Sequence, residues 1–143
     1  IYLVAVPVLS NLYKEHPQQA RRTAMRFILL ALALGVVLTL GFLAASPLVV
    51  ILLGDSFQGS VAILRILSLV LLFKSVGLAL AAIILATGQQ ARRTLVQALA
   101  AGFNILSNSL VVYWFGIRGV AGIYVLTEVI LLAGYGWIVW RKW

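Results

Sequence analysis

The sequence contains no cysteine, a single histidine and only three acidic residues among its 143 positions. The absence of cysteine excludes disulfide bonds and thiolate metal sites. His16 lies in a polar stretch without a cluster of other ligand-type side chains, so no metal site is expected there. A glycine-rich phosphate loop is also missing. These absences predict a protein that is not an enzyme and that has neither a cofactor nor a bound metal.

Charge is scarce as well. Charged residues make up 10% of the chain, whereas hydrophobic residues make up 64%, and a soluble domain carries roughly 25% charged residues. The charges cluster between long apolar runs, which is typical of a polytopic helical membrane protein. A net charge of +8 would favour a nucleic-acid partner in a soluble protein. Here we interpret it as the basic charge of cytoplasmic loops, and no nucleic-acid partner is expected.

The apolar runs predict an all-α fold, a polytopic transmembrane helix bundle with four complete spans and the tail of a fifth. The tail is expected over residues 1–13, and the complete spans over 23–45, 61–87, 95–115 and 119–140. A short interfacial helix is expected over 47–53, because Pro47 suits the first turn of a helix. Residues 14–22 are expected to form a polar loop, 88–93 a short basic turn, and 116–119 a tight turn.

The basic residues between these spans set the predicted orientation. Eight of them fall in alternate connections, whereas the opposite side has Arg118 alone. Cytoplasmic loops are enriched in lysine and arginine, so the richer side and the C-terminus are predicted to be cytoplasmic, and 47–60 to face outward. The residues on the predicted cytoplasmic side are Lys14, Arg21, Arg22, Arg26, Arg92, Arg93, Arg141 and Lys142.

Lys74 stands in the middle of the span over 61–87, where a charge costs about 2.5–3.5 kcal/mol or more and usually faces a bundle interior or a wet cavity. Glu128 is close to the middle of the last span, and Asn104 lies at similar expected depth in the span between them. Two hypotheses follow, and they are compatible. Lys74 and Glu128 form a buried ion pair with Asn104 as an interhelical hydrogen-bonding group. Alternatively, the three residues line a polar cavity that receives substrate or a coupling ion.

Further polar residues share faces with these. Gln97, Asn104 and Asn108 fall, together with Thr94 and Ala101, within an arc of roughly 80° on one helix. Tyr124 shares a face with Glu128. Arg65 is nine residues from Lys74 and therefore points to the opposite side of the helix. It is either an interface anchor or a basic site at the outer mouth of a cavity. The candidate substrate-binding residues are Lys74, Arg65, Gln97, Asn104, Asn108, Glu128 and Tyr124.

Several motifs in this order resemble the C-terminal half of polysaccharide flippases. They are the runs VPVLSNLY, PLVVILLGDSFQGSVAILRILSL, ATGQQARR and NILSNSLVVYWFGIRGVAGIYVLTE. Such proteins belong to the multidrug, oligosaccharidyl-lipid and polysaccharide exporter superfamily. The resemblance implies a fragment of a two-half transporter, similar to the multidrug and toxin extrusion fold, whose N-terminal half lies outside this chain.

The same resemblance implies a multi-pass protein of the bacterial cytoplasmic (inner) membrane. Its expected partners are the lipid bilayer and an undecaprenyl-pyrophosphate-linked sugar, which it would move to the outer leaflet by alternating access. Lys74 and Arg65 would be the cations that meet the pyrophosphate. A cation-coupled multidrug antiporter, with Glu128 as the coupling carboxylate, is an alternative. A non-transporting scaffold subunit is another, but it would need no polar layer. Lipid-linked sugar export is favoured because a cation and amides suit an anionic, hydroxylated ligand.

Overall fold

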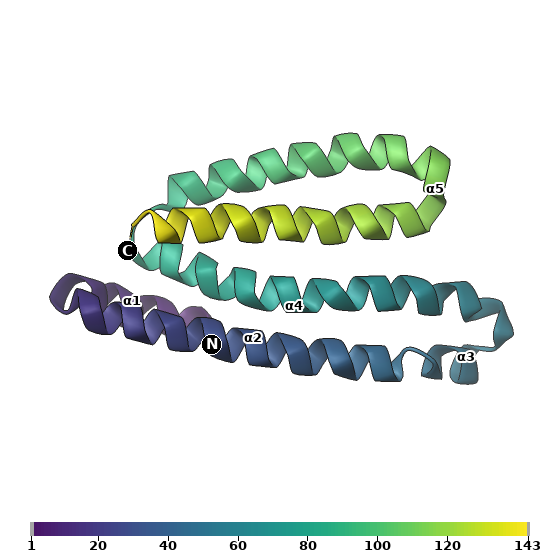
Figure 1. Ribbon diagram of the computed structural model, residues 1–143, viewed down its shortest axis with the longest axis horizontal. Helices are drawn as coiled ribbons and strands as arrows, with labels where there is room; N and C mark the ends of the chain where they lie inside the picture. The colour runs from purple at the N-terminus through teal and green to yellow at the C-terminus, as the bar shows by residue number, and fades with distance from the viewer. Residues whose placement is uncertain (1, 143) are drawn as a thin grey trace.

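The structure, a computed structural model, describes residues 2–142, and these form only helices and turns. The all-helical prediction is therefore confirmed over this range. Five α-helices and one short 3₁₀ helix follow one another (Figure 1). They are α1 (Tyr2–Glu15), α2 (Pro17–Ala45), α3 (Leu48–Leu53), η1 (Asp55–Phe57), α4 (Gln58–Ala86) and α5 (Gln90–Trp140).

The longest helix, α5, is folded back on itself. Its backbone leaves the helical region only at Gly116, with φ 58° and ψ −150°, a conformation that is essentially restricted to glycine. Figure 1 shows the two antiparallel arms that result. We call residues 90–115 the first arm and residues 117–140 the second arm. The turn expected over 116–119 is thus reduced to one non-helical residue, and α5 contains the spans expected over 95–115 and 119–140.

Three helices, α2, α4 and α5, are long and apolar enough to cross a membrane, which indicates a multi-pass membrane protein. Only 11%, 33% and 17% of their most apolar stretches are buried within the chain. Most of their apolar surface therefore faces outward, where lipid or further protein can cover it.

The polar loop expected over 14–22 is wrong, because α1 runs to Glu15 and α2 begins at Pro17. Proline is well tolerated in the first turn of a helix, and the glutamine, alanine and arginine residues that follow are good helix formers. The residues from Gln90 onward are also good helix formers. Helix α5 therefore begins at Gln90 and includes most of the turn expected over 88–93. The helices extend past the apolar runs from which their limits were predicted.

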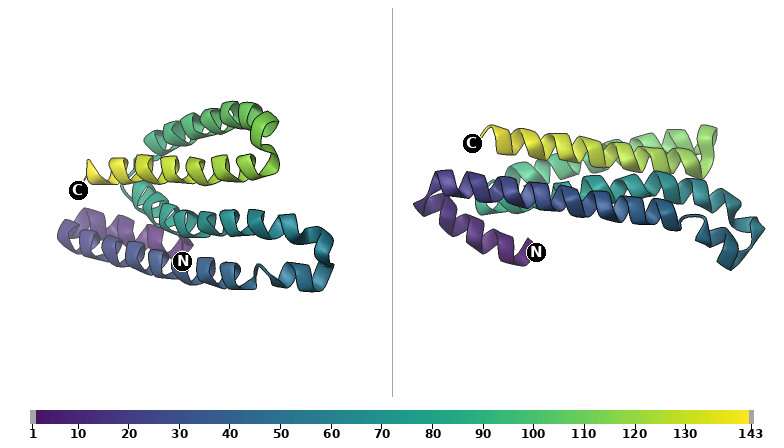
Figure 2. Two further views of the ribbon diagram at one scale, coloured as in Figure 1. Left: turned by 45° about the vertical axis from the view of Figure 1, so that its right-hand side comes forward. Right: turned by 60° about the horizontal axis from the view of Figure 1, so that its bottom comes forward.

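Helix α4 lies between α2 and the second arm, and the first arm lies beyond the second (Figures 1 and 2). The half-length helix α1 packs beside α2 and α4, where Leu9 joins a cluster with Ala24, Ala82 and Ile83. A second cluster joins α4 to the second arm through Leu80, Ala81, Ile84, Tyr135 and Ile138. Both clusters lie toward the end of the molecule that holds the α4–α5 turn and the C-terminus.

The α1–α2 turn, the α4–α5 turn and the C-terminus all lie at this end (Figure 1). We call it the basic end, because most basic residues of the chain belong to these segments. Helix α3 and the Gly116 turn lie at the opposite end, with Arg118 as the basic residue beside that turn. The turns thus alternate between the two ends as the sequence predicted. Which end faces the cytoplasm stays a prediction. The basic residues in the segments at the basic end are Lys14, Arg21, Arg22, Arg26, Arg92, Arg93, Arg141 and Lys142.

Away from the basic end, α2 and α4 approach closely and are joined by polar contacts. Gly35 is buried, and a Cβ atom there would lie 3.1 Å from the Cα atom of Leu72. One turn further along α2, the Thr39 hydroxyl donates a hydrogen bond of 3.0 Å to the carbonyl oxygen of Ser68. Gly35 and Thr39, four residues apart on α2, therefore set the distance between the two helices.

Candidate functional site

The site is built on α4 and the second arm of α5, which run in parallel (Figure 1). Near the basic end, Ala81 and Ile84 of α4 share a cluster with Tyr135 of the second arm. Two turns further from that end, the same helix faces bring Lys74 to Glu128. The register set by the apolar cluster thus places the cation and the carboxylate at the same depth.

Lys74 has two polar partners on the second arm. Its Nζ donates a hydrogen bond of 2.9 Å to Glu128 Oε1 and one of 3.0 Å to the hydroxyl oxygen of Tyr124. The same nitrogen is 5.4 Å from the centre of the Tyr124 ring, within range of a cation–π interaction. Tyr124 precedes Glu128 by four residues, so one helix face presents both partners.

The two members of this ion pair differ in exposure. The Glu128 side chain is 10% exposed, whereas that of Lys74 is 53% exposed. A charge facing hydrocarbon at the middle of a bilayer costs about 2.5–3.5 kcal/mol or more. The open side of Lys74 therefore requires water, further protein or a polar ligand in place of lipid tails.

A second polar network joins the two arms of α5. Asn104 Nδ2 donates a hydrogen bond of 2.8 Å to the Thr127 hydroxyl, and Asn108 Nδ2 donates one of 3.0 Å to Asn104 Oδ1. Asn104 is thus the interhelical hydrogen-bonding group of the first hypothesis, but its partner is Thr127. The sequence analysis missed Thr127, although its position beside Glu128 and three residues after Tyr124 was a usable signal.

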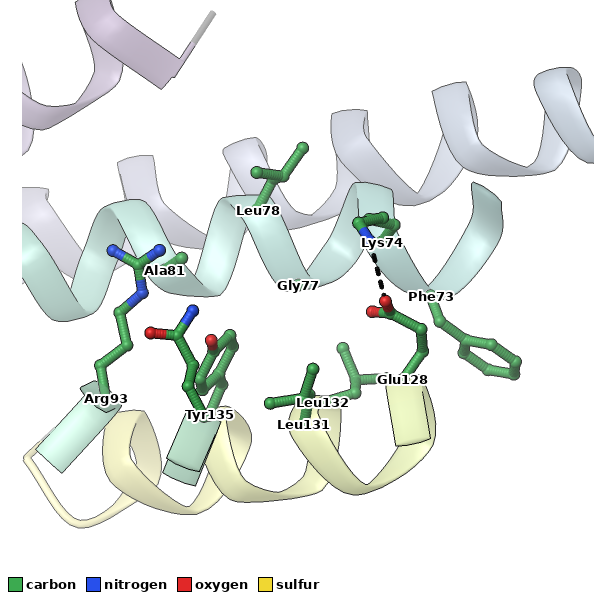
Figure 3. A pocket seen from close by; sticks show the side chains of 11 residues that line it. Phe73, Lys74, Gly77, Leu78, Ala81, Arg93, Glu128, Leu131, Leu132 and Tyr135 are labelled. Carbon is green, nitrogen blue, oxygen red and sulfur yellow. Dashed lines mark hydrogen bonds and ion pairs between the residues drawn. The ribbon is translucent and has the colours of Figure 1, made fainter. Parts of the chain in front are cut away.

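A pocket of about 170 Å³ lies between α4 and the two arms of α5 (Figure 3). Lys74 and Glu128 point toward one another at one end of it, and Arg93 lies at the other end, near Ala81. Gln97 of the first arm also contributes to the lining. Sequence analysis assigned Arg93 only to a basic turn, because its place in a pocket depends on how the first arm packs.

Arg65 lies outside this pocket and on the other side of α4. Its Nε donates a hydrogen bond of 3.2 Å to Ser46 Oγ, directly after the end of α2. Ser46 in turn donates a hydrogen bond of 2.9 Å to the carbonyl oxygen of Leu43. Arg65 therefore ties α4 to the end of α2 at the end opposite the basic end.

The structure thus brings together part of the predicted site. Lys74, Gln97 and Glu128 line the pocket, and Tyr124 binds Lys74. Asn104 and Asn108 belong to the neighbouring network between the arms. Within residues 2–142, no group of three or more histidine, cysteine, aspartate or glutamate side chains is arranged to hold a metal ion. Comparison of the chain with protein-family models, curated proteins and solved structures found no match.

Proposed function

We propose that this chain is part of a transporter that moves lipid-linked oligosaccharides across the bacterial cytoplasmic membrane by alternating access. The observation that carries the proposal is the half-exposed Lys74, held by Glu128 and Tyr124 midway along a membrane-length helix. A fixed cation with an open side is the feature that an anionic lipid headgroup needs when it leaves water. The motif resemblance to polysaccharide flippases supports the same function.

The ion pair provides a way to bind and release an anion. Without substrate, Glu128 neutralises Lys74, so neither charge is left uncompensated in the membrane. A pyrophosphate that reaches the open side of Lys74 competes with Glu128 for the same ammonium group. When the substrate leaves, Glu128 takes its place again. The ammonium group of Lys74 has three N–H donors. One of them can keep its hydrogen bond to the Tyr124 hydroxyl while another binds either anion, so Tyr124 holds Nζ in position throughout.

The amides near the site differ in what they offer to a sugar. Gln97 lines the pocket and is exposed, so its amide can donate to and accept from hydroxyls of a sugar that lies outside the pocket. Asn104 is engaged with both Thr127 and Asn108, and its main role in this structure is to join the two arms. Gln97 is therefore the first choice for a sugar contact among the three predicted amides.

A cation-coupled multidrug antiporter is the second candidate, favoured by the burial of Glu128. In such a protein, protonation of Glu128 would release Lys74, and the cycle of the pair would follow the proton gradient. The two functions differ in cargo. If the protein is an antiporter, cells with the Glu128→Gln variant should lose drug resistance. If it is a flippase, the same cells should accumulate lipid-linked oligosaccharide on the cytoplasmic side of the membrane.

The test uses cells in which this protein is the sole exporter of a surface polysaccharide. Three variants are compared: Lys74→Gln, the double variant Lys74→Gln with Glu128→Gln, and Arg118→Gln as the control. The double variant removes both charges and leaves no unpaired carboxylate, so its level in the membrane should match that of the parent. We expect both Lys74 variants to lose surface polymer and Arg118→Gln to retain it. Normal polymer from a well-expressed double variant would refute the proposal.

A further inference from the structure

Two adjacent arginines at the start of the first arm have different surroundings. Arg93 is half-buried and lines the pocket, and Figure 3 shows its guanidinium group directed toward α4 near Ala81. Arg92 is exposed, and its Nη1 donates a hydrogen bond of 2.9 Å to Gln89 Oε1. The turn at the basic end therefore presents one arginine to the outside and one to the pocket.

The rest of the pocket combines apolar walls with polar groups. Leu78, Leu131 and Leu132 form part of the walls. Lys74, Arg93 and Glu128 are the charged residues of the lining, so the pocket has two cations and one carboxylate. This lining suits a ligand that carries negative charge on one part and hydrocarbon on another.

The size and length of the pocket limit what it can hold. Its volume of about 170 Å³ is below the roughly 300–1,000 Å³ of typical small-molecule pockets, so it can take a headgroup but not an oligosaccharide. Ala81, near Arg93 in Figure 3, is seven residues from Lys74, which corresponds to about 10 Å along α4. The two cations therefore lie at opposite ends of the pocket.

We propose that this pocket binds the phosphate-bearing headgroup of a lipid, with the Arg93 guanidinium group as its main contact. Arginine matches phosphate oxygens with two parallel hydrogen bonds. Basic pockets between membrane helices on the cytoplasmic side are a recurring site for anionic headgroups. The hydrocarbon leaves through the open side of the pocket, past the exposed side chain of Leu78.

This inference deepens the proposed function, because it adds a binding step before Lys74. If the ligand is the transported lipid, its headgroup first binds Arg93 at the basic end and then reaches Lys74 at mid-depth. Two lipids have the required chemistry: the lipid carrier of the transported sugar, and an anionic phospholipid of the surrounding leaflet. The site is the same for both, and the probes below distinguish them.

The experiment measures lipid binding to the purified full-length protein in phosphatidylcholine nanodiscs, by native mass spectrometry. The probes are undecaprenyl phosphate, phosphatidylglycerol and inorganic phosphate. Arg93→Gln should weaken binding of at least one lipid probe about tenfold, which corresponds to about 1.4 kcal/mol. Arg92→Gln is the matched control and should change it less than twofold. Arg93→Lys keeps the charge without the planar fork, so we expect an intermediate loss.

Preference for undecaprenyl phosphate would support the site and identify the transported lipid as the ligand, and preference for phosphatidylglycerol would support it as a phospholipid site. Equal losses in Arg92→Gln and Arg93→Gln would overturn the inference, since surface charge alone would then explain binding. Unchanged binding in Arg93→Gln, or inorganic phosphate binding as tightly as the lipids, would overturn it as well. These outcomes are separate from the export test, because Lys74 can be required for export even if Arg93 binds no lipid.

Discussion

Replacing Lys74 by glutamine tests the ion pair between α4 and the second arm. The change removes a charged hydrogen bond of 2.9 Å and leaves Glu128, with its side chain only 10% exposed, without a cation. Breaking a fully buried pair costs about 3–5 kcal/mol, and one charged hydrogen bond contributes about 1.5–3 kcal/mol. Because half of the Lys74 side chain is exposed, we expect Lys74→Gln to destabilise the protein by about 1.5–3 kcal/mol.

The double variant, Lys74→Gln with Glu128→Gln, should recover most of this loss. Two amides at this distance can hydrogen-bond to each other, and no charge remains to be compensated. Thermal unfolding of the purified protein in detergent, for the parent, both single variants and the double variant, gives the coupling energy. We expect a coupling of about 1–2 kcal/mol, on the order found for contacting residues. Additive losses would show that the two side chains do not interact.

Three further predictions concern the helix contacts and the topology. Gly35→Ala should destabilise the protein by about 1–3 kcal/mol, because its Cβ would meet the α4 backbone, whereas Gly41→Ala, which has open space around it, should unfold at the parental temperature or slightly above. Gly116→Ala should cost about 1–3 kcal/mol in thermal unfolding, because its φ of 58° with ψ −150° is strained for any residue with a Cβ; an unchanged melting temperature would argue against the one-residue turn. A cysteine at Ser56 should react with an impermeant thiol reagent from outside intact cells and one at Gln90 should not; the reverse pattern would invert the orientation.

The sequence offered the pairing of Lys74 with Glu128 as one of two hypotheses, and it predicted that Arg65 points to the opposite side of the helix. Both follow from the position of each residue within its span and from the regular rise and turn of an α-helix. Gly35 and Thr39 of α2 show the same helix geometry, because residues four apart lie on one face. Gly35 lies at the close approach to α4, and Thr39 binds Ser68 one turn further along.

The pocket could not be derived in this way. Arg93 belongs to the same run of two arginines as Arg92, and only the packing of the first arm against α4 and the second arm makes them different. The partner of Asn104 was missed because it depends on how the second arm is rotated about its own axis, which the sequence does not give. A rotation of one residue decides whether Thr127 or Glu128 faces Asn104, and the structure has Thr127 there. The loop over 14–22 was predicted from its polar residues and from Pro17 as a helix breaker. Pro17 instead begins α2, and polar residues continue a helix readily once it leaves the apolar layer.

The most direct test of the central proposal is translocation in proteoliposomes that contain only the purified protein and a fluorescent pyrophosphate-linked oligosaccharide lipid. The rate is the fraction of label that becomes accessible on the opposite leaflet per unit time. The double variant, Lys74→Gln with Glu128→Gln, keeps the fold and lacks the cation, so we expect its rate to fall at least tenfold, while Arg118→Gln keeps the parental rate. Parental translocation by the double variant would contradict the proposal that Lys74 receives the anionic headgroup.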